Sequence, residues 1–85
     1  MNIDDVLAER RETHGDFRMH ATTTQDLKDV LRGCGYLEKL DASQAEALEM
    51  IVHKIGRILA GNPDEPDHWR DIAGYATLIE RQLSK

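Results

Sequence analysis

Cysteine is almost absent from this chain of 85 residues, which carries only Cys34, and no long apolar run occurs. One cysteine excludes a disulfide within the chain and fits a reducing compartment. No stretch approaches the roughly 20 apolar residues of a membrane span, and the acidic N-terminus is unlike a secretory signal. We therefore expect a soluble, cytoplasmic protein with no membrane partner.

Positive charge is also scarce, because 16 Asp and Glu outnumber 11 Lys and Arg and give a formal net charge of −5. This balance argues against a nucleic-acid backbone as the main partner, but acidic proteins can bind nucleotides through metal ions. A chain of this length forms one domain, residues 1–85, and buries only a modest share of its surface alone. We expect a homo-oligomer, and the sequence leaves homodimer and homotetramer both open.

Strand patterns are missing as well, since apolar residues do not alternate and β-branched residues do not cluster. Helical patterns cover most of the chain. We predict an all-α fold, a small antiparallel bundle of about four helices of which the first is short. The expected helices are Ile3–Glu12, a second from a cap at Asp16 to about Arg32, a third beginning after Asp41 or Ser43 and ending near Ala60, and Pro66–Leu83.

Glycine, proline and small polar residues mark the ends of these helices. Gly15 is expected to end the first helix in a left-handed conformation. Ser43 and Glu46 have the spacing of a capping box, and the stretch 61–63, Gly-Asn-Pro, stops the third helix. Wheel positions place Trp69 in the apolar stripe of the last helix, where packing is its expected role. His20 borders the stripe of the second helix and is expected to be structural.

Carboxylates recur on the polar faces of the last two long helices. Glu46 and Glu49 stand three apart, and Asp67 and Asp71 follow on the next helix. A solvated helix face is the simplest interpretation, in which Glu49 and His53 form an i,i+4 pair that contributes about 0.2–0.5 kcal/mol. However, Met50, Tyr75 and Leu78 lie among these acids, which indicates a second buried surface. Partly buried carboxylates need a cation, and oxygen ligands suit Mg²⁺ or Mn²⁺.

The order of these motifs resembles a known family. Glu46-x-x-Glu49 on one helix, followed after a loop by an acidic pair that ends at Asp71, is similar to the MazG-like nucleotide pyrophosphohydrolases of the all-α NTP pyrophosphatase group. Their motif is E-x-x-E followed by E-x-x-D. The resemblance covers about Ser43 to Leu83 and includes Tyr75. It implies an oligomeric helical bundle and Mg²⁺-dependent hydrolysis of a nucleoside triphosphate to a monophosphate and pyrophosphate.

The sequence departs from that motif at position 68, where the family has glutamate and this chain has His68. Either Asp67 supplies the missing oxygen or His68 binds the metal through nitrogen. The resemblance thus implies Glu46, Glu49, Asp71, Asp67 and His68 as metal ligands. The wording of the stretches 14–17, 53–59 and 67–76 also resembles small phage- and prophage-borne proteins.

Within this hypothesis Glu49 orients or deprotonates the attacking water. Lys54, Arg57 and Lys28 are the candidate phosphate ligands. His14 has two interpretations: it lies over the nucleotide, or it belongs to a plain helix stop at Gly15. The alternative to an enzyme is a non-catalytic helical protein with a degenerate pyrophosphohydrolase fold, which binds a protein or a nucleotide without turnover.

Overall fold

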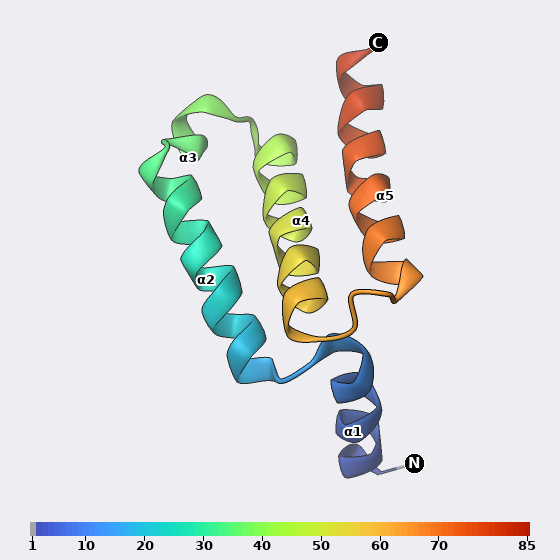
Figure 1. Cartoon of the computed structure of the whole chain (residues 1–85). Helices are drawn as coiled ribbons and strands as arrows, with labels where there is room; N and C mark the ends of the chain where they lie inside the picture. Colours follow the sequence, from blue (N-terminus) through green and yellow to red (C-terminus); the bar gives the residue numbers. More distant parts are fainter. Residues whose placement is uncertain (1) are drawn as a thin grey trace.

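The computed structural model describes residues 2–85, and every regular element in this range is a helix (Figure 1). The all-α prediction is therefore confirmed. The five helices are α1 (Ile3–His14), α2 (Phe17–Gly33), α3 (Tyr36–Lys39), α4 (Ala42–Ala60) and α5 (Pro66–Leu83). The prediction of about four helices missed α3, a single turn between α2 and α4. A four-residue helix is too short for a periodic pattern to reveal.

The predicted helix ends are mostly confirmed. α4 ends at Ala60 and α5 spans Pro66–Leu83, as expected from the Gly-Asn-Pro stop and from a first-turn proline. The capping box at Ser43 was wrong. The N-cap of α4 is Asp41, whose carboxylate accepts a hydrogen bond from the Gln44 N–H at 2.8 Å, and the Gln44 side-chain oxygen accepts from the Asp41 N–H at 3.0 Å. Asp16 occupies the N-cap of α2, but its side chain makes no capping hydrogen bond.

Helix α4 is the centre of the structure. It packs against α2 on one side and α5 on the other, so that the three long helices lie side by side in one layer (Figure 1). α1 packs mainly against the lower ends of α2 and α4, touches the start of α5 through His14 and His68, and extends away from the layer. The polar side chains of the lower part of α4 therefore meet α1 as well as α2.

The backbone segment that follows α1, at Gly15, crosses the segment that follows α4, at Gly61, and the two are in contact. A Cβ on Gly15 would lie 1.9 Å from the Ala60 carbonyl oxygen, and one on Gly61 would lie 2.4 Å from that of Thr13. Gly15 also has φ +81°, a conformation that favours glycine. The Asn62 N–H donates to the Thr13 carbonyl oxygen at 3.1 Å across this crossing. The crossing fixes the start of α2 and the end of α1 against the C-terminus of α4.

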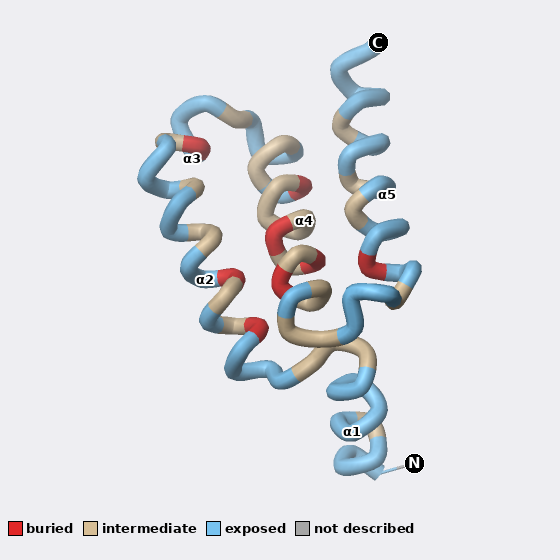
Figure 2. Tube along the Cα trace, in the orientation of Figure 1, coloured by how far each residue is buried: buried red, intermediate tan, exposed pale blue. Residues whose placement is uncertain are grey.

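The helices α2 and α4 approach closely at Gly56. A Cβ there would lie 2.5 Å from Thr24 Cγ2 and 2.8 Å from His20 Nδ1. Both neighbours are buried, and Thr24 is only 2% exposed. The buried positions of α2 lie on the side of α4 in Figure 2, and the two residues there, His20 and Thr24, are both polar.

Apolar burial is small in the single chain. Among residues 2–85 the buried hydrophobic side chains are Tyr36, Ala47 and Val52, whereas ten large hydrophobic ones are exposed. The predicted packing role of Trp69 was wrong, because its side chain is 54% exposed and its indole N–H donates to the Pro63 carbonyl oxygen at 2.8 Å. His68, the candidate metal ligand next to Trp69, is by contrast only 2% exposed. The buried state of His20 agrees with its predicted structural role.

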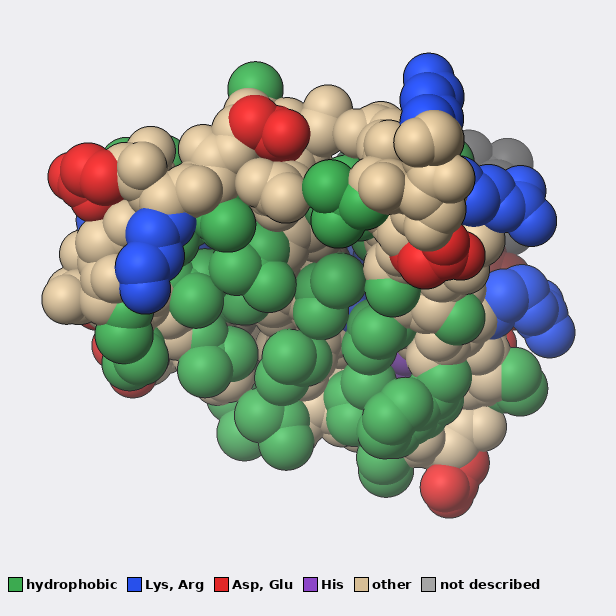
Figure 3. All heavy atoms as spheres, turned by 90° about the horizontal axis from the view of Figure 1, so that it is seen from above, with side chains coloured by type: hydrophobic (Ala, Val, Ile, Leu, Met, Phe, Trp, Pro, Cys, Tyr) green, Lys and Arg blue, Asp and Glu red, His purple; other side chains and the backbone are tan. Residues whose placement is uncertain are grey.

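One face of the layer remains apolar and open. The groove between the upper halves of α4 and α5 is lined mainly by aliphatic side chains, which include Leu40, Leu48, Ile51, Ile79 and Leu83. Figure 3 shows apolar side chains gathered into a continuous surface on one side of the molecule. The radius of gyration is 14.6 Å, whereas a compact chain of this length has about 12 Å. The single chain is therefore elongated and leaves much apolar area in water.

Replacement of Gly15 by alanine tests the backbone crossing. Gly15→Ala should destabilise the fold by at least about 2 kcal/mol, because the new Cβ overlaps the Ala60 carbonyl group and strains a positive φ. Gly74→Ala is the matched control. Nothing lies within 4 Å of its Cβ position in α5, so it should stabilise the helix by about 0.5–1 kcal/mol. Chemical denaturation at equal protein concentration measures both, and equal stability of the two variants would contradict the crossing.

Candidate anion-binding site

A cavity of about 310 Å³ lies where α1, the N-terminus of α2 and the C-terminal half of α4 meet. Its walls come from residues far apart in the sequence, brought together by the crossing at Gly15 and Gly61. The lining residues are Leu7, Arg10, Arg11, His14, Gly15, Asp16, Phe17, His20 and Arg57. We call this cavity the arginine pocket.

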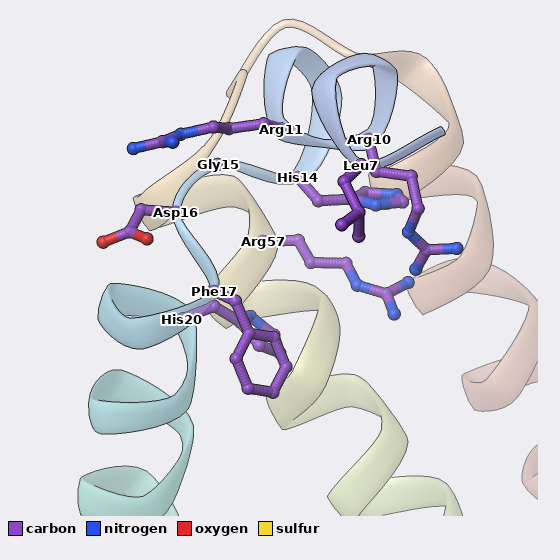
Figure 4. A pocket seen from close by; sticks show the side chains of 9 residues that line it. All are labelled: Leu7, Arg10, Arg11, His14, Gly15, Asp16, Phe17, His20 and Arg57. Atoms are coloured by element: carbon purple, nitrogen blue, oxygen red, sulfur yellow. The ribbon is translucent and has the colours of Figure 1, made fainter. Parts of the chain in front are cut away.

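Two arginines carry the charge of this pocket. Figure 4 shows the guanidinium groups of Arg10, from α1, and Arg57, from α4, pointing toward the same place beside the His14 ring. Arg11 and Asp16 point to the other side. Neither Arg10 nor Arg57 belongs to any of the four ion pairs formed within residues 2–85. Neighbouring positive charges without a carboxylate repel each other unless an anion lies between them.

Four histidines form two pairs at the base of this region. His14 and His68 have ring centroids 5.5 Å apart, and those of His20 and His53 are 5.8 Å apart. His68 Nε2 lies 3.0 Å from the Thr13 carbonyl oxygen. By contrast, the buried Nδ1 atoms of His14 and His20 have no hydrogen-bond partner within residues 2–85. Both side chains line the arginine pocket, but these two atoms are buried, and His20 Nδ1 faces Gly56 of α4, where a Cβ would lie 2.8 Å from it.

The electrostatic environment of these histidines is positive. Burial, followed by the charges of Arg57 and Arg10, lowers the pKa of His14 below its usual 6.5. Burial and the charge of Arg57 also lower the pKa of His20. For His53, burial lowers the pKa and the charges of Lys28 and Arg57 add to the effect. Burial and the nearby cations together therefore disfavour the protonated form of these three imidazoles.

Glu49 lies two turns before Arg57 on α4, on the side that faces α2 and α3. Its carboxylate accepts a hydrogen bond from the Tyr36 hydroxyl at 3.2 Å and lies 3.6 Å from Lys28 Nζ. The predicted phosphate ligand Lys28 is therefore close to the predicted catalytic carboxylate. Glu46, one turn earlier on α4, lines a different groove, beside Tyr75 and Leu78 of α5.

The remaining predicted site residues lie on the other side of α4. Asp71 forms an ion pair with Lys54 at 2.9 Å, and this hydrogen bond lowers the pKa of its carboxyl group. Asp67 pairs with Arg70 at 2.7 Å on the exposed start of α5. His68 contacts His14 and the Thr13 carbonyl instead of a carboxylate.

The five candidate metal ligands do not form one cluster in the single chain. Within residues 2–85 no group of three or more His, Cys, Asp or Glu side chains is placed to hold a metal ion. Glu49 and Asp71 each face a lysine, which takes the place that a cation would have. The residues as arranged do not fit a bound Mg²⁺ or Mn²⁺, and the metal-site hypothesis stays a prediction.

The structure brings together His14 and Arg57, which the sequence predicted as nucleotide ligands, and places Lys28 and Lys54 outside their pocket. Sequence reasoning missed Arg10 and Phe17 as members of the same site. The two arginines at positions 10 and 11, about one helical turn before His14, were the available signal. It could not be interpreted without the position of α1 beside α4.

Comparison with known proteins gives a family without a described activity. The chain belongs to a family described as a domain of unknown function, DUF6378, whose model matches residues 4–83. No curated protein and no solved structure is detectably similar to it. None of the helices between residues 2 and 85 has both the length and the apolar character needed to cross a membrane. The arginine pocket is therefore the main guide to function.

Stability should fall on mild acidification. The pKa values of His14, His20 and His53 are lowered, so the unfolded chain binds more protons than the folded one just below pH 6.5. The resulting stability is complete above pH 6.5 and is lost as the pH falls toward the folded-state values. Denaturant midpoints should therefore decrease from pH 7.5 to pH 5.5.

His20→Asn should flatten this dependence, because it removes one of the three titrating groups. Measurements above pH 5 avoid the titration of Asp71, whose pKa is lowered from an already acidic value. A wild-type midpoint that stays constant or rises on acidification would show that these imidazoles are not held neutral by the fold.

Proposed function

We propose that this protein binds a nucleoside triphosphate through its phosphate groups in the arginine pocket. The observation that carries the proposal is the pair of guanidinium groups of Arg10 and Arg57, which share one place and have no carboxylate partner within residues 2–85. Guanidinium groups bind phosphate oxygens with two parallel hydrogen bonds. A polyphosphate supplies the several negative charges that such a place requires.

The backbone adds to this preference. The pocket includes Phe17, the first residue of the 17-residue helix α2, whose N-cap side chain makes no hydrogen bond to the first-turn N–H groups. Free N–H groups and the helix dipole both favour an anion at this end. The side chains of His14 and His20 also line this cavity. The two guanidinium groups, the start of α2 and the two imidazoles all border the same cavity.

A second proposal follows from the resemblance to MazG-like enzymes, namely metal-dependent hydrolysis of the nucleotide to a monophosphate and pyrophosphate. It is supported by the position of Glu49, which stands on α4 eight residues before Arg57, about 12 Å along the helix. His53 lies midway between them. Turnover requires that Lys28 and Lys54 release Glu49 and Asp71, so binding without hydrolysis is the form that the observed contacts favour.

Self-association is part of this proposal. The apolar groove between α4 and α5 and the small apolar core of one chain both favour burial against a second copy. A two-fold arrangement would bury the same helix pair from each copy, which is the commonest symmetry of homo-oligomers. Glu46 lies at the edge of this groove, so assembly would also change its surroundings.

Removal of either guanidinium group tests nucleotide binding. Arg57→Gln and Arg10→Gln should each weaken binding of ATP and of inorganic tripolyphosphate about tenfold or more, because each removes a charge-assisted hydrogen bond to phosphate. Arg81→Gln, near the end of α5, is the matched control and should bind like the wild type. Titration calorimetry measures the affinities. If all three variants bind equally well, the phosphates bind elsewhere.

Pyrophosphate release from a panel of nucleoside triphosphates, with Mg²⁺ or Mn²⁺, distinguishes turnover from binding. Hydrolysis predicts metal-dependent release that Glu49→Gln abolishes. Binding alone predicts a nucleotide-dependent rise in melting temperature without release. Nucleotides that neither stabilise the protein nor yield pyrophosphate would contradict both proposals.

Charges placed on the apolar surface of α5 test the assembly. A double variant, Leu78→Glu with Leu83→Glu, should reduce the solution mass to that of the 9.7 kDa single chain, because both side chains are exposed at the apolar grooves. Val30→Glu with Leu37→Glu alters two comparably exposed side chains on α2 and α3 and should keep the wild-type mass. Sedimentation analysis measures both, and a wild-type protein that is monomeric at micromolar concentration would exclude this interface.

A further inference from the structure

Phe17 is the only phenylalanine of the chain and lies on the wall of the arginine pocket. Its ring is 78% exposed, although it begins a helix that buries other side chains. Exposure by itself does not distinguish it, because nine other large apolar side chains are exposed in residues 2–85. Its position does. It is the one Phe, Tyr or Trp side chain among the residues that line the arginine pocket, where the other two rings are those of His14 and His20.

The orientation of Phe17 relates it to the charged groups. Figure 4 shows its ring directed to the same side of the pocket as the guanidinium groups of Arg10 and Arg57. Leu7 supplies a second apolar side chain on the opposite wall, from α1. The pocket therefore combines a cationic part with an open apolar part, the two characters that one nucleotide presents in its phosphates and its base.

The ring of Phe17 has a histidine ring as its neighbour. Its centroid lies 6.2 Å from that of His20, and the two planes are inclined at 41°. His20 is itself only 8% exposed and sits against Gly56 of α4, where no Cβ would fit without movement. An aromatic side chain that is largely open to solvent can stack on a flat aromatic ligand, and with two side-chain torsions it loses little conformational freedom in doing so.

We propose that Phe17 is the stacking platform for the base of the bound nucleoside triphosphate. This inference rests on the proposed function, in which Arg10 and Arg57 hold the phosphates. The cavity of about 310 Å³ is at the lower end of the range of small-molecule sites, which suits one nucleotide better than a dinucleotide or a nucleic-acid chain. Stacking on an aromatic face tolerates every base, so we expect purine and pyrimidine nucleotides to bind.

The test compares ligands with and without a base. Affinities of ATP, UTP and inorganic tripolyphosphate are measured by calorimetry for wild type, Phe17→Leu and Phe17→Trp. Loss of the ring should weaken ATP and UTP about fivefold to a hundredfold, since that is the usual contribution of one stacked base. Tripolyphosphate affinity should remain within about twofold. Phe17→Trp should retain nucleotide affinity, and the solution mass of all variants should equal that of the wild type.

The outcomes separate this inference from the proposed function. If Phe17→Leu weakens tripolyphosphate as much as ATP, Phe17 only maintains the pocket and the platform is wrong. Unchanged ATP and UTP affinities in Phe17→Leu would also overturn it, as would a change in oligomeric mass, which would make Phe17 an interface residue. If wild type binds neither nucleotide nor tripolyphosphate, the proposed function itself fails and this inference fails with it.

Discussion

The carbonyl group of Thr13 is the point on which the architecture depends. It accepts a hydrogen bond from the Asn62 N–H and lies 3.0 Å from His68 Nε2, so one oxygen joins the end of α1 to the α4–α5 loop and to α5. This arrangement requires backbone contact between Gly15 and Gly61, where side chains would not fit. A short helix with little apolar burial of its own is thereby held against the end of the central helix.

The position of α1 creates the arginine pocket. Arg10 and His14 lie one turn apart on α1, and the crossing places both beside Arg57 near the end of α4. Without α1, Arg57 would be an ordinary surface residue of a long helix. The same crossing sets the start of α2, with Phe17 and His20, on the opposite wall. The backbone crossing at Gly15 and Gly61 thus explains why basic and aromatic residues from three helices meet.

The charged residues around α4 are paired at some places and unpaired at others, although the protein as a whole is acidic. Glu49, on the α2 side of α4, and Asp71, on α5, are each matched by a lysine, and the Tyr36 hydroxyl donates a hydrogen bond to Glu49. In the arginine pocket, Arg10 and Arg57 form no ion pair with a carboxylate among the described residues, and their charge contributes to the lowered pKa of His14. Net composition conceals this separation, because it averages the two parts. The unpaired positive charge in the arginine pocket is what supports the proposal of a phosphate-bearing ligand.

The sequence by itself determined the helical class, the stop at Gly61 and the bounds of α5, because caps, proline and apolar periodicity act over a few residues. It also identified His14 and Arg57 as candidates for one ligand. Only the tertiary structure decided that Trp69 is exposed and His68 buried, and that Arg10 and Phe17 join the site. Helical periodicity tells which residues share a face, whereas the partner of that face depends on a backbone crossing between segments more than forty residues apart.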